Sequence, residues 1–356
     1  MTHLFNYKWF LSDGYPANGF DKNDYNVFGT FICGGGSTMG YKLAGFNHLG
    51  GVEIDPKIAK VYQINHKPKY LFVEDIRQFV KRSDIPEELY NLDLLDGSPP
   101  CSSFSMAGNR EKDWGKKKVF KEGQAEQVLD DLFFEYIALA KKLQPKVVLA
   151  ENVKGLIQGN AKMYVKRIFK AFDEAGYNAQ LFLLNAASMG VPQKRERVFF
   201  ICQRKDLNLP KLKLEFSESP ILFKEVIEKD VNGKPITGKM LDLWNLRSKT
   251  DKGLRSVSER INNNVLFFGT SLQHKEDVPF TLISQTSSPI VHFDKPYLTT
   301  DKENCQIGTY PLDYDFQDVE PKYLIGMSVP PVMTAQIASQ IKIQWLDKIK
   351  AKQCQD

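Results

Sequence analysis

The stretch FICGGGS, residues 31–37, separates a strand predicted over 27–33 from a helix predicted over 38–44. The same rhythm continues along the chain, with further strands predicted over 48–54, 92–96, 146–150, 178–185 and 197–202 and further helices over 56–65, 130–143 and 162–175. Helices of this length between strands make crossover connections, which join parallel strands. We therefore predict an α/β fold, a doubly wound and mostly parallel sheet with helices on both faces.

The glycines at 34–36 allow the backbone of this turn to approach a bound ligand closely. Glu53 stands at the end of the next strand, where an acidic side chain can accept hydrogen bonds from a ribose diol. Asp75 follows the short apolar run 70–73 and can receive the amine of an adenine. The helix start lacks a basic residue for a pyrophosphate, so we expect a nucleoside cofactor without phosphates. The alternative is a turn with a structural role only.

The composition is that of an ordinary globular protein, with 356 residues, 42% hydrophobic and 26% charged. The net charge of +5 permits a polyanionic partner without demanding one. The five cysteines include no Cys-x-x-Cys pair, so we expect neither a disulfide scaffold nor a metal site. We find no signal-peptide pattern and no apolar run near the ~20 residues that span a bilayer. We expect a cytoplasmic protein with no membrane partner.

The alternation of strands and helices stops near Leu207. We predict a catalytic and cofactor-binding domain over 1–222, in which 1–26 is an extension packed on the surface. The region 223–299 mixes Asn, Ser and Lys with short β-like runs, and we predict a second, smaller and irregular domain there. The C-terminal segment 300–356 is expected to return to the first domain.

A cysteine follows two prolines in the stretch GSPPCSSFS, residues 97–105, directly after the predicted strand 92–96. The prolines fix φ and favour extended backbone before them, so Cys101 is presented from a stiff turn. A thiol held in this way suits nucleophilic chemistry. The other interpretation is a small buried cysteine between a strand and a loop.

Charged residues stand at two further strand ends. Glu151 follows the apolar run 147–150, where an apolar surround would favour its neutral form, which can donate a proton or a strong hydrogen bond to a ring nitrogen. Its alternative role is to stabilise a helix N-terminus. Arg195 and Arg197 alternate before a strand, so both are expected to project to one side and to grip a phosphate or a carboxylate. The alternative is a solvated charge run.

Together these segments resemble the motifs of the DNA (cytosine-5)-methyltransferase family, of the bacterial and phage type. The matching segments follow the family's order over nearly the whole chain: the glycine turn, the Pro-Cys segment, and residues 151–153, 193–197 and 323–331. Several positions depart from the family pattern, and the run 297–303 lacks the arginine that the penultimate motif usually carries after Leu-Thr-Pro. Cys33 replaces the first glycine of the turn, Ser102 stands where glutamine is usual, and Met327 stands where asparagine is usual.

The resemblance implies a Rossmann-like fold and methyl transfer from S-adenosylmethionine to carbon 5 of cytosine, with S-adenosylhomocysteine as the product and no metal. Cys101 would add to carbon 6 of the ring, and Glu151 would bind or protonate N3. Arg197 would hold the cytosine carbonyl or the adjacent backbone, with Arg195 nearby. Because a base inside a duplex cannot reach such a pocket, the target cytosine has to be flipped out.

The resemblance also implies which residues bind. Those implied for the cofactor are Phe31, Gly34, Gly35, Gly36, Glu53, Ile54, Asp75, Pro100, Leu132 and Ser328. Those implied for DNA or the flipped base are Ser98, Pro99, Ser102, Asn152, Gln193 and Thr281. The basic segment 107–127 is expected to close over the DNA, and the region 223–299 to recognise the target sequence.

Double-stranded DNA is the partner that the resemblance implies. We expect a monomer, with a cognate restriction endonuclease in the same system but no physical complex with it. An RNA cytosine-5 methyltransferase could share the fold, although a separate domain the size of 223–299 is typical of the DNA enzymes. A nicotinamide-dependent oxidoreductase could use the glycine turn, although it leaves the Pro-Cys segment unexplained. An inactive, DNA-binding relative is the third alternative.

Overall fold

The computed structural model describes residues 3–15, 22–100, 132–158, 162–229, 233–262, 266–267 and 269–353. The chain divides into two compact units. The sheet unit comprises Gly19–Asn185, Glu196–Glu215 and Thr334–Asp356. The irregular unit comprises Met1–Asn18, Ala186–Arg195 and Phe216–Met333. Neither unit is one continuous stretch of chain.

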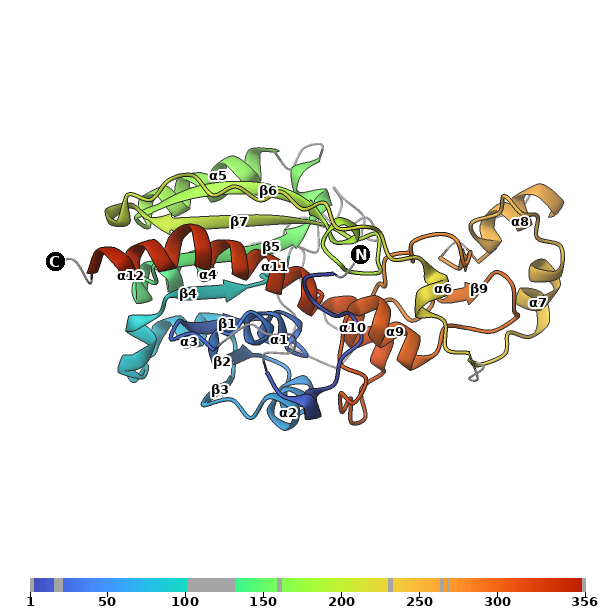
Figure 1. The fold of residues 1–356 in the computed structure, drawn as a ribbon, viewed down its shortest axis with the longest axis horizontal. Coiled ribbons are helices and arrows are strands. Elements are labelled where there is room, and N and C mark those ends of the chain that lie inside the picture. Colours follow the sequence, from blue (N-terminus) through green and yellow to red (C-terminus); the bar gives the residue numbers. More distant parts are fainter. Residues whose placement is uncertain are drawn as a thin grey trace. The chain divides into compact units, whose positions relative to one another are not determined.

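Seven strands form the sheet of the sheet unit, in the order β3-β2-β1-β4-β5-β7-β6 (Figure 1). Their bounds are β1 Asn26–Thr30, β2 Asn47–Glu53, β3 Tyr70–Val73, β4 Leu94–Gly97, β5 Val147–Val153, β6 Tyr177–Asn185 and β7 Glu196–Arg204. All neighbours from β3 to β5 pair in parallel, whereas β7 runs antiparallel to both β5 and β6. The predicted mostly parallel sheet is confirmed, and the apolar run 70–73 forms an additional strand, β3.

Helices connect the parallel strands, as the alternating pattern predicts. Those of the sheet unit are α1 Gly36–Leu43, α2 Pro56–His66, α3 Ile76–Lys81, α4 Leu132–Leu143, α5 Lys162–Glu174 and α12 Asp347–Gln353. In α4 the buried residues recur every three or four positions, which gives the helix one apolar face. Phe79 of α3, Phe133 of α4 and Phe172 of α5 lie in one core cluster with Phe28 of β1 and Phe200 of β7. These three helices therefore pack on the sheet through a shared aromatic core.

The strand order reverses between β1 and β4. From β1 the chain crosses to β2 on one side, and from β4 it crosses to β5 on the other side. Ligands of open α/β sheets bind at such a point, beyond the carboxyl ends of the strands. The register pairs Gly29 with Asp96 and Thr30 with Gly97. The glycine turn after β1 and the Pro-Pro segment after β4 therefore leave the sheet side by side.

The irregular unit has short elements joined by long loops. They are α6 Phe223–Val226, α7 Gly238–Asn245, α8 Leu254–Asn262, β8 Ser271–Gln273, β9 Ile290–His292, α9 Asp301–Gly308 and α10 Pro321–Met327, and α11 Pro331–Ile341 begins in this unit. The unit contains the region 223–299 together with 186–195 and 300–333. A small apolar core, which includes Trp244, Leu254 and Leu272, holds α7, α8 and β8 together.

Two aromatic side chains of the N-terminal segment are buried in the irregular unit, so the segment that we expected to pack on the surface is anchored in a core. Phe5 and Trp9 are only 1% and 3% exposed. The Trp9 indole donates a hydrogen bond to the carbonyl of Thr309 at 2.9 Å. Phe5 and Trp9 thus help to fill a core, whereas Phe10 is 42% exposed.

Candidate active site

The glycine turn after β1 contains three left-handed residues. Phe31, Cys33 and Gly35 have φ of +53°, +47° and +78°. Glycine adopts this region readily, whereas a residue with a Cβ is strained there by about 1–2 kcal/mol. Cys33 therefore introduces strain at the position where the family pattern has glycine.

Replacing Cys33 with glycine should raise the free energy of unfolding by about 0.5–1 kcal/mol, because the removed strain exceeds the entropy that glycine adds to the unfolded chain. Gly35→Ala is the matched variant, which should change the free energy of unfolding in the opposite direction. Its Cβ would lie 2.2 Å from Nε2 of His66 at a φ of +78°, so it should lower that free energy by about 1–3 kcal/mol. Chemical denaturation measures both variants, and a destabilised Cys33→Gly protein would contradict the strained turn.

Glu53, at the end of β2, is buried and holds the glycine turn in place. Its Oε2 accepts the backbone N–H of Cys33 at 2.9 Å, and its Oε1 accepts that of Asp55 at 3.0 Å. Burial raises the pKa of this carboxyl, and the two backbone hydrogen bonds oppose the rise. Each carboxylate oxygen has a second lone pair, so Glu53 can still accept a hydroxyl group of a ligand.

His66, at the end of α2, contacts the backbone of the glycine turn. The sequence did not point to this residue. Its Nε2 lies 3.1 Å from the carbonyl oxygen of Gly34. Burial lowers the pKa of His66 to about 3, so the ring is neutral near pH 7. The neutral ring must then carry its proton on Nε2 in order to donate to this carbonyl.

The other cofactor-binding residues that the resemblance implies in the sheet unit lie either at the carboxyl edge of the sheet or in the apolar core. Ile54 is half-buried directly after β2. Asp75 follows β3, where its Oδ1 accepts the backbone N–H of Arg77 at 2.8 Å and caps α3. Leu132 is 3% exposed at the start of α4, inside the apolar core cluster. Ile54 and Asp75 thus lie at the carboxyl edge of the sheet, whereas Leu132 packs in the core.

Strand β4 ends at a position that has no room for a side chain. A Cβ on Gly97 would lie 2.5 Å from Cε2 of Tyr136 and 2.6 Å from Oγ1 of Thr30. The Tyr136 hydroxyl lies within hydrogen-bond distance of the carbonyls of Leu95, at 2.9 Å, and Leu149, at 2.7 Å, and so links β4 to β5. The direction in which the chain leaves β4 is therefore set by close packing.

Asn152 of β5 binds the segment that follows β4. Its Nδ2 donates to the carbonyl of Pro99 at 3.0 Å, and its Oδ1 accepts the backbone N–H of Val153 at 2.9 Å. Pro99 is buried, while Ser98 and Pro100 are half-buried. Asn152 was implied as a DNA-binding residue, and in this structure its side chain holds the backbone that leads to the Pro-Cys segment.

Three parts of the predicted site lie outside the described residues. They are Cys101, Ser102 and the segment 107–127. Their roles stay predictions.

An ion pair joins β5 to β7 at the same edge of the sheet. Oε1 of Glu151 lies 3.0 Å from Nε of Arg197, and the two side chains are 11% and 15% exposed. Burial lowers the pKa of Arg197, and the charge of Glu151 opposes this. Glu151 thus faces a guanidinium instead of the apolar surround that we expected. The reason is that β7 runs antiparallel, which brings its first residues to the carboxyl end of β5.

Arg195 is buried in the irregular unit, where it links two loops through backbone carbonyls. It is 2% exposed, and its guanidinium donates to the carbonyls of Leu282 and Ser328, both at 2.8 Å. We expected Arg195 and Arg197 to grip one anion together. The structure differs, because Arg195 is committed to backbone carbonyls of the irregular unit and Arg197 to a carboxylate of the sheet unit.

The other predicted residues of the irregular unit also make contacts inside it. Gln193 is 1% exposed, and its Nε2 donates to the carbonyl of Ile307 at 3.0 Å. The Thr281 hydroxyl donates to the carbonyl of Lys194. Ser328 is 5% exposed and ends α10. These polar groups serve the architecture of the irregular unit in this structure.

Within the described residues, no group of three or more His, Cys, Asp or Glu residues could hold a metal ion. Within the same residues, no helix is both long and apolar enough to cross a membrane.

The model of the C-5 cytosine-specific DNA methylase family matches residues 25–343. The chain belongs to this family. It is therefore a DNA cytosine-5 methyltransferase, and the activity and family predicted from the motifs are confirmed. The nicotinamide and RNA alternatives are not favoured.

Curated relatives of this methyltransferase are Type II methyltransferases. The chain is 29% identical to M.NgoPII from Neisseria gonorrhoeae over 360 residues, which cover 90% of this chain and 96% of that enzyme. It is 40% identical to M.FnuDI from Fusobacterium nucleatum over 195 residues, which cover 55% of this chain and 51% of that enzyme. The match to M.FnuDI thus spans about half of each protein.

A solved structure has the same fold. A DNMT2 mutant from Spodoptera frugiperda superposes with a TM-score of 0.62 at 18% identity, over 89% of this chain and 99% of that chain. This likeness concerns the fold alone. The predicted Rossmann-like methyltransferase fold is confirmed.

Proposed function

We propose that this enzyme transfers the methyl group of S-adenosylmethionine to a cytosine flipped out of double-stranded DNA, with Cys101 as the nucleophile. The observation that supports this most is the convergence of three features at one sheet edge: the glycine turn, the Pro-Pro segment and the Glu151–Arg197 pair. Open α/β sheets bind their ligands at this edge.

The residues after β1, β2 and β3 fit a methyl donor that carries a nucleoside. The carboxylates of Glu53 and Asp75 can accept hydrogen bonds from hydroxyl and amine groups, and the turn 31–37 contains no cation that would favour a phosphate. Phe31 and Ile54 are half-buried there and offer apolar surface to an adenine. When it is bound, S-adenosylmethionine supplies an electrophilic methyl group.

The chain's own groups make carbon 5 of cytosine nucleophilic. The Cys101 thiolate forms a bond to carbon 6, and the electrons of the 5,6 double bond become available at carbon 5 as an enamine. Glu151 binds or protonates N3, which takes up the charge that the addition pushes into the ring. Carbon 5 gains the methyl group, then loses its proton to a base, and expulsion of the thiolate restores the aromatic ring.

Two contacts in the structure support these roles. Arg197 holds Glu151 by an ion pair at 3.0 Å, which orients the carboxyl group. Asn152 holds the carbonyl of Pro99 at 3.0 Å, two residues before Cys101. Such positioning matters because a nucleophile must be aligned before it can react.

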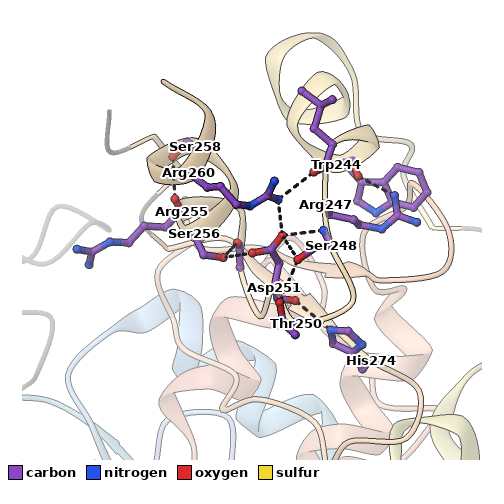
Figure 2. Close-up of polar contacts among 12 residues, drawn as sticks. Trp244, Arg247, Ser248, Thr250, Asp251, Arg255, Ser256, Ser258, Arg260 and His274 are labelled. Atoms are coloured by element: carbon purple, nitrogen blue, oxygen red, sulfur yellow. Dashed lines mark hydrogen bonds and ion pairs between the residues drawn. The ribbon is translucent and has the colours of Figure 1, made fainter. Parts of the chain in front are cut away.

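We assign target recognition to the region 223–299 of the irregular unit. There Asp251 is a buried hub between α7 and α8 (Figure 2). Its carboxylate accepts the backbone N–H of Ser248 at 2.7 Å, the hydroxyl of Ser256 at 2.9 Å and the guanidinium of Arg260 at 2.8 Å. These bonds hold the loop 246–253 in one conformation.

The outer surface of this loop is basic. The loop 246–253 contains three cations, Arg247, Lys249 and Lys252, and a single acid, Asp251, which is buried. Arg247 lies 3.2 Å over the ring of Trp244 and so serves packing, whereas Lys249 and Lys252 are exposed. We propose that these two lysines contact DNA phosphates, which position a protein on a duplex without reading its sequence.

Replacing Lys249 and Lys252 together with alanine should weaken DNA binding on every sequence. The slope of log K against log salt should fall by about 2, because each lysine that neutralises a phosphate releases about one counterion. A matched control replaces Lys166 and Lys170, which are exposed on α5, and removes the same charge. Binding of a labelled duplex at several salt concentrations measures both slopes, and equal slopes would contradict this assignment.

M.FnuDI and M.NgoPII are Type II methyltransferases, and this supports proposals about the cellular context of the present enzyme. We infer that this enzyme modifies DNA in a restriction-modification system with a cognate endonuclease. We further infer that it acts as a monomer in the bacterial cytoplasm or nucleoid.

Bisulfite sequencing of DNA from cells that express this enzyme tests the proposed function. We expect 5-methylcytosine at one recurring sequence and none there in cells that carry the empty vector. Methylation of transfer RNA without methylation of duplex DNA would contradict the proposal. Thermal stabilisation by NAD, with none by S-adenosylmethionine or S-adenosylhomocysteine, would contradict its cofactor.

A further inference from the structure

Asp96 is a buried carboxyl group that the proposed mechanism does not use. It lies in β4, is 5% exposed, and pairs in register with Gly29 of β1, at the point where the strand order reverses. Its Oδ1 accepts a hydrogen bond from the Tyr41 hydroxyl at 3.1 Å. A buried acid at the ligand-binding edge of a sheet is a candidate for a functional role.

The partners of Asp96 come from the helix that follows the glycine turn. Ser37 and Tyr41 belong to α1, which begins at Gly36, and both hydrogen-bond to the Asp96 carboxyl group. The Thr30 hydroxyl donates to the Asp96 carbonyl at 3.3 Å. Asp96 thus connects the start of α1 to the strand that leads into the Pro-Cys segment.

We infer that Asp96 is a positioning residue for methyl transfer, which holds α1 against β4 and sets part of the charge that Glu151 faces. The inference rests on the proposed function. In this role Asp96 touches neither the base nor the methyl donor, and it acts through α1 and Glu151.

The surroundings of Asp96 place its titration near neutral pH. Burial raises the pKa of Asp96 to about 7, and the charge of Glu151 on β5 adds to the rise. The hydrogen bonds from Tyr41 and Ser37 oppose it. Two further phenols interact electrostatically with the carboxyl group, Tyr136 from α4 and Tyr62 from α2, and burial raises the pKa of each, so both stay neutral near pH 7.

Ionisation of Asp96 has two consequences. The hydrogen bonds from α1 become charge-assisted and stronger. The ionised carboxylate also adds a negative charge near Glu151, whose own charge acts on Asp96. Methyl transfer should therefore change as the pH passes through about 7, by a step that belongs to Asp96.

Folding stability offers a readout that does not depend on activity. Asp96 has a folded-state pKa of about 7 against an ordinary value of 3.8, so between these values the folded chain holds a proton that the unfolded chain has released. Stability therefore falls as the pH rises through this window. Asp96→Asn removes this loss, so its Tm should fall less between pH 5 and pH 8 than that of the wild-type enzyme.

The test compares Asp96→Asn with Asp93→Asn. Asp93 is an equally buried acid near the other end of β4, where it pairs with Lys146 at 2.7 Å, and it has no part in the proposed chemistry. We expect Asp96→Asn to lower kcat by about tenfold, as small misplacements of reacting groups do, and to abolish the step near pH 7 in kcat/KM. Asp93→Asn should keep both the rate and the step.

Tyr41→Phe is the second variant, which removes the hydrogen bond and keeps the charge. It should lower kcat and keep a pH step. If Asp96→Asn does not fold, an unchanged kcat in Tyr41→Phe overturns the inference. It is also overturned if Asp96→Asn and Asp93→Asn share one rate and one pH profile. A wild-type chain that methylates no DNA would instead refute the proposed function.

Discussion

Replacing Cys101 with serine is expected to lower methyl transfer by at least about a thousandfold and to leave DNA affinity nearly unchanged. A serine hydroxyl is far less ionised than a thiol near pH 7 and is a weaker nucleophile, so the bond to carbon 6 does not form. Transfer of tritiated methyl groups to a duplex measures the rate, and a gel-shift titration measures the affinity.

A second cysteine provides the control for this variant. Cys305→Ser changes a buried cysteine of α9 that has no part in the proposed chemistry. It should retain methyl transfer, although a buried hydroxyl lowers its stability by about 1–3 kcal/mol. A Cys101→Ser enzyme that methylates DNA at the wild-type rate would refute covalent catalysis by this residue.

Replacing Glu151 with glutamine should lower kcat by about 10²–10⁴-fold, because an amide cannot donate a proton to N3 in the step in which Cys101 adds. The side chain keeps its size and much of its hydrogen bonding. Single-turnover rates with saturating duplex and cofactor measure the chemical step. A rate within twofold of the wild type would contradict the role of Glu151 at N3.

This variant also leaves Arg197 without its charged partner, so stability has to be followed beside the rate. Removing one member of a fully buried ion pair lowers the free energy of unfolding by about 3–5 kcal/mol. We expect a smaller loss in Glu151→Gln, because the side chains of Glu151 and Arg197 are both partly exposed. Glu196→Gln is the matched control. Glu196 is the first residue of β7 and pairs with Lys154 at 2.7 Å, but its side chain is 42% exposed. It should retain nearly full rate and stability.

The fold and the edge that carries the site could be predicted from local patterns. Glu53 and Glu151 each follow an apolar run, and the glycines at 34–36 follow another. In a parallel sheet the carboxyl ends of strands share one edge, so groups after three strands are brought together whatever their detailed contacts. The placement of these groups at one edge could therefore be predicted without knowing which strands pair.

The partners of these groups could not be predicted, because they depend on contacts between distant segments. Glu151 meets Arg197 only because β7 enters the sheet in the antiparallel sense beside β5. Arg195 is buried only because the carbonyls of Leu282 and Ser328 surround it. A pair of arginines has the same pattern in a sequence whether it is solvated, grips an anion or clamps a loop.

Asp93 and Asp96 illustrate the same limit within one strand. Both stand in the run LDLLD, residues 92–96, and the local sequence pattern does not indicate which of the two lies near a ligand. The structure places Asp93 directly before β4, beside Lys146, and Asp96 near the other end of that strand, beside Tyr41. Only the second lies at the ligand-binding edge.

We expect Cys101 to form a transient bond to carbon 6 of cytosine during methyl transfer. A duplex with 5-fluorocytosine at the target position tests it most directly, because fluorine cannot leave carbon 5 as a proton does and the covalent complex persists. We expect a denaturant-resistant protein–DNA complex that requires S-adenosylmethionine and is absent with Cys101→Ser. Methylation of the natural duplex without any such complex, or a complex that forms with Cys101→Ser, would contradict the claim.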